Sequence, residues 1–294
     1  MTAESGLLIV DKPASWTSHD VVARIRKLTG SKRVGHAGTL DPMATGVLVV
    51  GIEKATRLLG YLTLAEKEYT ATIRLGQTTA TDDADGEPID HVPVRNMDQA
   101  VLQRAVAGLT GQISQVPPGV SAIKVGGQRS YRLARAGQAP QLAARTVTVA
   151  DFTVETIRPA ADLLDLDVHV TCSSGTYIRA LARDLGAELG VGGHLTALRR
   201  TRVGPYLVSQ ARTLDELAGE LAVIPLAAAA AAAFPRRELT QEQARALAQG
   251  ARLDPGGTGP EPVAAFAPDG SLVALLTDVD GRARSLAVFA TPGS

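Results

Sequence analysis

The order of apolar and polar residues predicts that short strands and helices are mixed along the chain. Residues 6–10 form an apolar run that a polar Asp-Lys-Pro segment ends, as expected of a short buried strand. Residues 17–30 then carry apolar side chains at helical spacing and end at a glycine. A loop rich in Gly, Ala and Thr follows at residues 34–45 and leads into a strand at residues 46–52.

The rest of the chain continues this mixture. We expect a helix at residues 54–64, a strand at 69–75, an acidic loop at 77–90, a helix at 101–111, strands at 120–125, 146–154 and 163–171, and helices at 130–136 and 178–189. Hairpins mixed with helices favour an α+β fold over a strictly alternating one. The prediction is a mixed, largely antiparallel central sheet with flanking helices.

A change of composition predicts a second domain at the end of the chain. Seven consecutive alanines, Ala227–Ala233, lie between two prolines and form either a short helix or a junction. Beyond them, the pattern predicts a helix at residues 241–249 and strands near 263–266, 272–276 and 286–289. We therefore expect a first domain at residues 1–233 and a small β-rich one at 234–294, which is near the lower size limit for a domain that folds alone.

Length and composition exclude several classes of protein. With 294 residues, 45% of them hydrophobic, the chain can bury a sizeable core. A single cysteine, Cys172, cannot form an internal disulfide, and no Cys or His cluster has zinc spacing. The N-terminus has no basic run, and its apolar stretch is too short for a signal peptide or a membrane span. We expect a cytoplasmic protein without a bound metal and without membrane attachment.

The charges are balanced in number but unevenly distributed. Lys and Arg number 30, as do Asp and Glu, yet residues 112–145 contain five basic residues and no acidic one. Residues 191–214 contain four arginines and again no acid. Such segregation produces either a basic surface that attracts phosphates or ordinary solvated arginines on helix faces.

One loop carries the chemistry that the sequence makes most conspicuous. Residues 35–48 read Gly-His-Ala-Gly-Thr-Leu-Asp-Pro-Met-Ala-Thr-Gly-Val-Leu, and their three glycines allow tight turns and close approach to a ligand. Pro42 keeps Asp41 out of a helical conformation, so the carboxylate sits on an extended segment where a loop meets a strand. Catalytic groups concentrate on such loops. A carboxylate that only stabilises a turn is the alternative.

These motifs resemble the TruB family of tRNA pseudouridine synthases, in an actinobacterial-like form. The resemblance extends in the same order from about Gly6 to Gly204 and rests on residues 35–48, Leu8–Pro13, Lys67–Thr70, Arg74–Gln77 and Cys172–Arg179. It implies the pseudouridine synthase fold and an isomerase that converts uridine 55 in the TΨC loop of tRNA to pseudouridine. The C1′–N1 glycosidic bond is broken, the base turns while bound, and C5 is joined to C1′. Such a reaction needs no cofactor, because a carboxylate serves as nucleophile or base.

The resemblance also implies roles for individual residues of the active site. Asp41 would be the essential carboxylate, and whether it adds to the base, attacks C1′ or removes the C2′ proton is open. Arg179 would pair with Asp41 and favour its ionised form, although an arginine can also bind a phosphate. Tyr69 would stack on the target base, or it is only a core residue of its strand. Tyr177 and Leu198 would line the pocket, or they serve packing alone.

Further residues would contact or support the RNA-binding surface. The target base must leave the folded RNA, and His36 would enter the TΨC loop in its place, unless that histidine is structural. Lys12 would support the active-site strand and loop. The insertion at residues 112–145 would grip the tRNA loop. The arginines that would meet phosphates are Arg129, Arg132, Arg135, Arg199, Arg200 and Arg202.

The partners follow from the same resemblance. We expect the TΨC arm of tRNA as substrate, no obligate protein partner, and a monomer. The tail at residues 234–294 would be a PUA-like domain that binds RNA, or a cap that only stabilises the fold. Two competing functions are a tRNA-folding chaperone, suggested by the acid-free basic segments, and a glycoside hydrolase. The latter requires a second carboxylate, for which Asp83 is a candidate.

Overall fold

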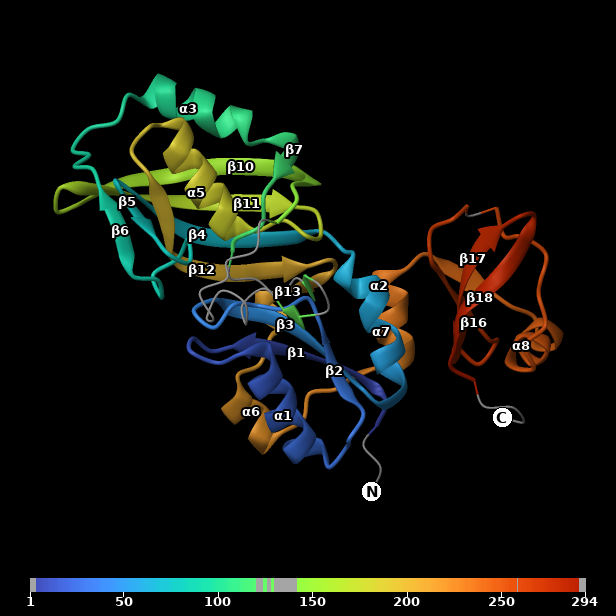
Figure 1. Ribbon diagram of the computed structural model, residues 1–294. Coiled ribbons are helices and arrows are strands. Elements are labelled where there is room, and N and C mark those ends of the chain that lie inside the picture. The colour runs from blue at the N-terminus through green and yellow to red at the C-terminus, as the bar shows by residue number, and fades with distance from the viewer. Residues whose placement is uncertain (1–3, 120–123, 126–127, 130–141, 258, 291–294) are drawn as a thin grey trace. The chain divides into compact units, whose positions relative to one another are not determined.

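The computed structural model describes residues 4–119, 124–125, 128–129, 142–257 and 259–290. The chain divides into two compact units. The first unit comprises Met1–Asp41, Gly46–Leu64 and Gly204–Ser294, and the second comprises Pro42–Thr45 and Ala65–Val203. Each unit contains a sheet with its own covering helices, as the α+β prediction requires (Figure 1).

The first unit begins with a small antiparallel sheet. In it β1 (Gly6–Lys12) pairs with both β3 (Thr45–Ile52) and β14 (Ile224–Pro225), and β3 also pairs with β2 (Val34–Ala37). The buried side chains of one face pack against α1 (Ser18–Thr29) and α6 (Leu214–Gly219). A capping box between Thr17 and Asp20 fixes the start of α1, and Gly30 ends the helix in the left-handed conformation with φ 66°.

The end of the first unit forms the small β-rich module that the sequence predicted. The alanine run is helix α7 (Leu226–Ala233). It is followed by a four-stranded sheet of β15 (Arg236–Glu238), β16 (Val263–Phe266), β17 (Leu272–Val279) and β18 (Arg282–Val288), with α8 (Gln241–Ala248) packed on it. The Lys54 ammonium donates a hydrogen bond of 2.9 Å to the Phe289 carbonyl, which ties the end of this module to η1 (Glu53–Arg57).

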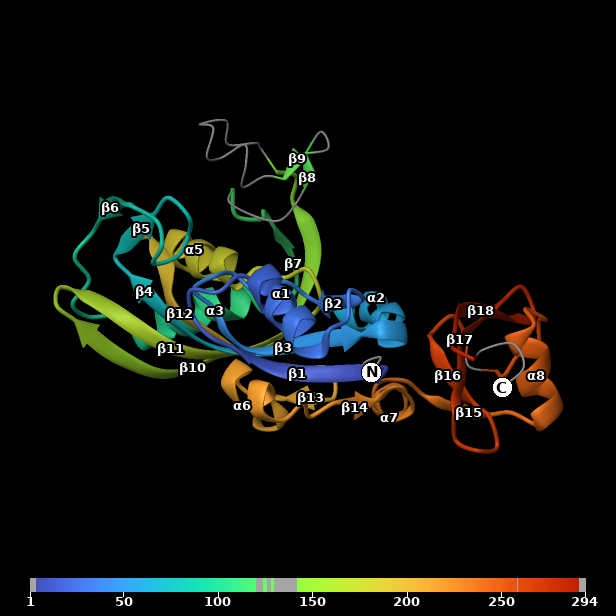
Figure 2. The ribbon, with the colours of Figure 1, turned by 90° about the horizontal axis from the view of Figure 1, so that it is seen from below.

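The second unit is built on five antiparallel strands. Their order is β12 (Gly193–Val203), β4 (Lys67–Leu75), β11 (Leu163–Cys172), β10 (Arg145–Ala160) and β7 (Gly111–Gln115). β10 and β11 form a long curved hairpin (Figure 2). Helices α3 (Gln99–Gly108) and α5 (Ile178–Glu188) cover the same face of the sheet (Figure 1). Alternate residues of β4 are buried, which confirms the predicted half-buried strand.

Several short elements differ from those that the pattern of residues predicted. Residues 77–90, expected to be a loop, contain the hairpin of β5 (Gln77–Thr79) and β6 (Pro88–His91). The loop expected at 34–45 contains β2, whose glycine hides the alternation of a strand. The helix expected at 54–64 is divided into η1 and α2 (Leu59–Thr63). Other short elements are β8 (Lys124–Val125), β9 (Gln128–Arg129), β13 (Tyr206–Leu207) and η2 (Val208–Gln210). The helix expected at 130–136 lies outside the described residues, and of the strand expected at 120–125 the structure describes Lys124 and Val125.

Candidate functional site

Asp41 lies on a loop whose backbone is held by a buried serine. Ser18, 1% exposed at the first position of α1, donates its hydroxyl to the Leu40 carbonyl at 3.2 Å and accepts from the Leu40 amide at 2.9 Å. Both backbone groups of the residue before Asp41 are therefore satisfied. Gly38 takes a φ of 78°, a conformation that suits glycine. Asp41 is half-buried on this fixed segment.

Lys12 is fully buried at the end of β1. Its ammonium donates to the Pro13 carbonyl at 2.8 Å and to the Trp16 carbonyl at 2.6 Å. These two bonds fix the turn between β1 and α1, in which Ser15 takes a positive φ of 67°. The two bonds are compatible with the supporting role expected of Lys12, and that role stays a prediction.

His36 is half-buried on β2, and its ring meets that of His19 from α1. The ring centroids are 5.6 Å apart and the rings stand at 81°, an edge-to-face arrangement. This contact limits the orientations open to the His36 ring. Its entry into an RNA loop stays a prediction.

Tyr69 and Leu198 lie on one face of the sheet of the second unit. Tyr69 on β4 is 6% exposed, and Leu198 on β12 is 7% exposed. The strand register pairs Leu198 with Ala71 and Arg200 with Tyr69, so these side chains share a face. Arg200 is 1% exposed and lacks the accessibility that the expected phosphate contact requires.

Buried charge surrounds the N-terminal end of β4. Lys67, 6% exposed, donates to the Ala65 carbonyl at 2.7 Å. Burial, and then the charge of Arg200, lowers the pKa of Lys67 to about 8. Cys172, the register partner of Lys67, is buried as well, and its burial raises the thiol pKa to about 11. Cys172 is therefore a protonated, unreactive thiol at neutral pH.

A buried glutamine holds Tyr177 just before α5. Gln115 is 1% exposed at the end of β7. Its side-chain amide donates to the Tyr177 carbonyl at 3.1 Å, and its oxygen accepts from the Tyr177 amide at 2.8 Å. Both backbone groups of Tyr177 are thus fixed by one side chain. No feature of the sequence pattern singled out Gln115.

Arg179, on the first turn of α5, is held in a buried ion pair with Asp83. The distance from Arg179 Nη1 to Asp83 Oδ2 is 3.3 Å, and the two side chains are 4% and 6% exposed. The same nitrogen donates to the Thr81 carbonyl at 2.8 Å. The other oxygen of Asp83 accepts from the Thr81 hydroxyl and from the Asp85 amide. The sequence drew attention to Asp83 as a candidate second carboxylate of a glycoside hydrolase, and not as the partner of Arg179.

The remaining predicted arginines differ in what they contact. Arg199 donates to the Thr45 hydroxyl at 3.3 Å, and Arg202 is paired with Glu66 and Glu68 at 2.6 Å each. Arg129 belongs to β9. Arg132 and Arg135 lie outside the described residues.

The predicted residues fall into two groups. Lys12, His36 and Asp41 belong to the first unit, and the four predicted pocket residues of the second unit are Tyr69, Tyr177, Arg179 and Leu198. Across the described ranges, no group of His, Cys, Asp or Glu is placed to hold a metal ion. None of the helices described is long and apolar enough to cross a membrane.

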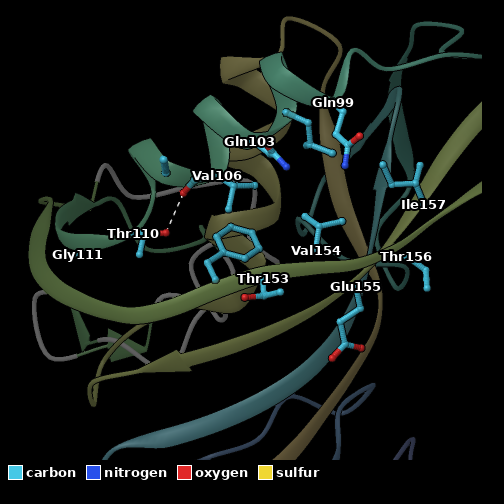
Figure 3. Close-up of a pocket in the computed structure, with 13 residues that line it drawn as sticks. Gln99, Gln103, Val106, Thr110, Gly111, Thr153, Val154, Glu155, Thr156 and Ile157 are labelled. Atoms are coloured by element: carbon cyan, nitrogen blue, oxygen red, sulfur yellow. Dashed lines mark hydrogen bonds between the residues drawn. The ribbon is translucent and has the colours of Figure 1, made fainter.

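A separate pocket of about 720 Å³ lies between α3 and β10 (Figure 3). Its wall includes Gln99, Gln103, Val106 and Phe152, and Glu155 is the charged residue among those that line it. A pocket with an acid and no basic side chain does not suit a phosphate. None of the predicted site residues lines it.

Comparison with known proteins identifies related sequences along nearly the whole chain. Residues 26–178 match the model of the TruB family pseudouridylate synthase N-terminal domain. Residues 179–227 match the tRNA pseudouridylate synthase B C-terminal domain, and residues 234–290 match the C-terminal domain of tRNA pseudouridine synthase II.

Among curated relatives, tRNA pseudouridine synthase B of Thermobifida fusca is 62% identical over 289 residues, covering 97% of this chain and 98% of the relative. The enzyme of the same name from Streptomyces coelicolor is 59% identical over 295 residues, covering 98% of this chain and 98% of the relative. Solved structures with a similar fold belong to related proteins. A chain of a Cbf5-Nop10-Gar1 complex superposes with a TM-score of 0.77 at 27% identity, over 98% of this chain and 85% of that one.

Proposed function

The chain belongs to the TruB family of pseudouridylate synthases, and from this premise we propose that it isomerises uridine 55 in the TΨC loop of tRNA with Asp41 as the essential carboxylate. The family makes it an RNA uridine isomerase. The observation that carries the role of Asp41 is its position on the Ser18-held loop, within the segment that matches the family model.

The reaction exchanges one bond of the base for another. The C1′–N1 bond breaks, the detached base turns, and C5 bonds to C1′. N1 then gains a proton, and C5 loses the hydrogen that it carried. Because the base stays bound throughout, the site must hold a planar ring and exclude water. Asp41 acts as a nucleophile toward the base or C1′, or as a base toward C2′.

The other residues of the site receive roles that fit their surroundings. Tyr69 and Leu198 share a face of the sheet with Arg200, and we propose that Tyr69 stacks on the flipped base while Leu198 lines its pocket. Tyr177, with both backbone groups bound by Gln115, gives that pocket a fixed wall. Arg179 is the cation that we propose stabilises the ionised Asp41, and Asp83 keeps its guanidinium oriented.

RNA binding draws on residues outside this pocket. We propose that His36 enters the space that the flipped base vacates, oriented by its contact with His19. Arg199 and the arginines of residues 112–145 are proposed to meet phosphates. The module at residues 234–290 is proposed as a PUA-like RNA-binding domain, supported by its own sheet and core. A cytoplasmic monomer without an obligate protein partner completes the proposal.

The direct test is release of tritium from tRNA transcripts whose uridines are tritiated at C5. Wild-type protein should release tritium, whereas Asp41→Asn should not, although its tRNA affinity should stay close to wild type. Asp280→Asn is the matched control, because Asp280 is an exposed carboxylate whose positive φ of 53° asparagine also tolerates. Full activity of Asp41→Asn would overturn the catalytic assignment. If the wild-type protein promotes tRNA folding but modifies no uridine, the result would favour a tRNA chaperone over an enzyme.

A further inference from the structure

Two arginines of α5 bind three consecutive residues of one loop. Arg179 and Arg183 are four residues apart and so lie on the same side of the helix. Arg179 binds the Thr81 carbonyl at 2.8 Å and the Asp83 carboxylate at 3.3 Å. Arg183 Nη1 binds the intervening Asp82 carboxylate at 3.2 Å. The two guanidinium groups therefore clamp the loop that orients Arg179.

Asp82 has a backbone conformation that needs support. Its φ is 59°, in the left-handed region that residues other than glycine rarely adopt. Its amide donates to the Thr79 carbonyl at 3.3 Å, and its carbonyl accepts from the Leu195 amide at 3.1 Å. The Asp82 side chain is 18% exposed. Burial raises the pKa of this carboxyl, and the charge of Arg183 is the largest effect that opposes the rise.

Arg183 also reaches the segment that holds Tyr177. Its Nη2 donates to the Val116 carbonyl at 2.8 Å. Val116 directly follows Gln115, whose side chain binds both backbone groups of Tyr177. One arginine thus joins the loop that orients Arg179 to the strand end that fixes Tyr177.

The contacts of Arg183 argue against a role in binding phosphate. Its Nε donates to Asp184 at 2.9 Å, Nη1 to Asp82 and Nη2 to Val116. All three nitrogens of the guanidinium are engaged within the protein, and the side chain is 29% exposed. A guanidinium held in this way acts on its own surroundings and not on a ligand.

We propose that Arg183 and Asp82 form a positioning pair that keeps Arg179 and Tyr177 in register for catalysis. The inference rests on the proposed function, in which Arg179 and Tyr177 belong to the pocket. Neither Arg183 nor Asp82 touches the substrate. Loss of their pairing lets the loop of residues 81–83 relax, and the Arg179 guanidinium loses its fixed orientation. Turnover then suffers, whereas RNA binding does not.

The test is a double-mutant cycle on the full-length protein with tRNA transcripts. Asp82→Asn keeps the size of the side chain and tolerates the left-handed conformation, so it isolates the charge. Arg183→Gln removes the matching charge. We expect each variant to lower kcat about fivefold, with KM and tRNA affinity within about twofold of wild type, and the double variant to be no slower than either single one. Arg158→Gln, which breaks the pair between Arg158 on β10 and Asp167 on β11, should leave kcat unchanged.

Other outcomes overturn the inference in identifiable ways. Unchanged kcat in both single variants would show that the pair does not position the pocket. Independent losses that multiply in the double variant would show that the two residues act separately. Weaker tRNA binding in Arg183→Gln, with a smaller salt dependence, would make Arg183 a phosphate contact. Thermal unfolding of every variant separates these results from misfolding. Absence of activity in wild-type protein would instead contradict the proposed function.

Discussion

Replacing Asp83 by asparagine would test how strongly the fold depends on the buried charge of Arg179. Asparagine keeps the shape of the side chain and can still accept a hydrogen bond from the Asp85 amide. It removes the negative charge that lies 3.3 Å from Arg179 Nη1. Since the Arg179 side chain is 4% exposed, water cannot replace that charge without opening the loop.

The size of the effect follows from the burial of both partners. Removing one partner of a buried ion pair costs about 3–5 kcal/mol, because the other charge stays buried without compensation. Arg179 keeps its bond of 2.8 Å to the Thr81 carbonyl, which partly solvates the guanidinium. We therefore expect a loss near the lower end, about 3 kcal/mol of the free energy of unfolding.

Urea unfolding followed by circular dichroism measures this loss, and hydrogen exchange of the β4 and β11 amides assigns it to the second unit. The matched control is Asp162→Asn in the same unit, since Asp162 pairs with His91 at 2.9 Å but both side chains are at least 40% exposed. The control should keep a urea midpoint close to that of wild type. Equal midpoints for the two variants would refute the idea that burial makes the Asp83 pair important.

Three further predictions concern pairing, pH and salt. Gln115→Ala should cost about 1–3 kcal/mol, because the Tyr177 amide loses its bond to the Gln115 oxygen while the Tyr177 carbonyl keeps the bond from the Leu181 amide at 3.2 Å, and urea unfolding would reveal a smaller cost if water replaces the glutamine side chain. Because burial lowers the pKa of Lys67 to about 8, the folded protein releases the Lys67 proton at a lower pH than the unfolded chain does. The free energy of unfolding of the wild type should therefore rise by about 3 kcal/mol relative to that of Lys67→Met as pH rises from 8 to 10.5. Parallel curves of stability against pH for the two proteins would contradict this. The affinity for tRNA should fall about tenfold or more between low and physiological salt, and an unchanged affinity would argue against phosphate contacts.

Elements with a strong periodic pattern could be predicted from the sequence. The alternation of β4 and the helical spacing of α1 each reflect one buried face, which the sequence displays directly. Strands β2 and β7 escaped prediction, because they are short and gain their stability from pairing with distant strands. The division between η1 and α2 was likewise invisible, since the residues on both sides of Leu58 suit a helix.

The candidate site was predictable in its residue types but not in its supporting contacts. The Gly-rich, pre-proline setting of Asp41 predicts a carboxylate on a constrained loop, and only the resemblance gave it partners. The contact of Ser18 with Leu40 joins residues 22 positions apart, and that of Arg179 with Thr81 joins residues 98 apart. Local patterns carry no information on such contacts. The burial of Arg200 could not be predicted either. Its charge suggested an exposed position, but on β12, opposite Tyr69, its side chain is 1% exposed.

The central claim is that Asp41 enables pseudouridine formation at one position of tRNA. Its most direct test maps pseudouridine in tRNA from cells that lack the gene and carry either the wild-type or the Asp41→Asn copy. The proposed function predicts pseudouridine at position 55 with the wild-type copy and unmodified uridine there with Asp41→Asn, at equal protein levels. Pseudouridine at position 55 in cells that carry only the Asp41→Asn copy would contradict it.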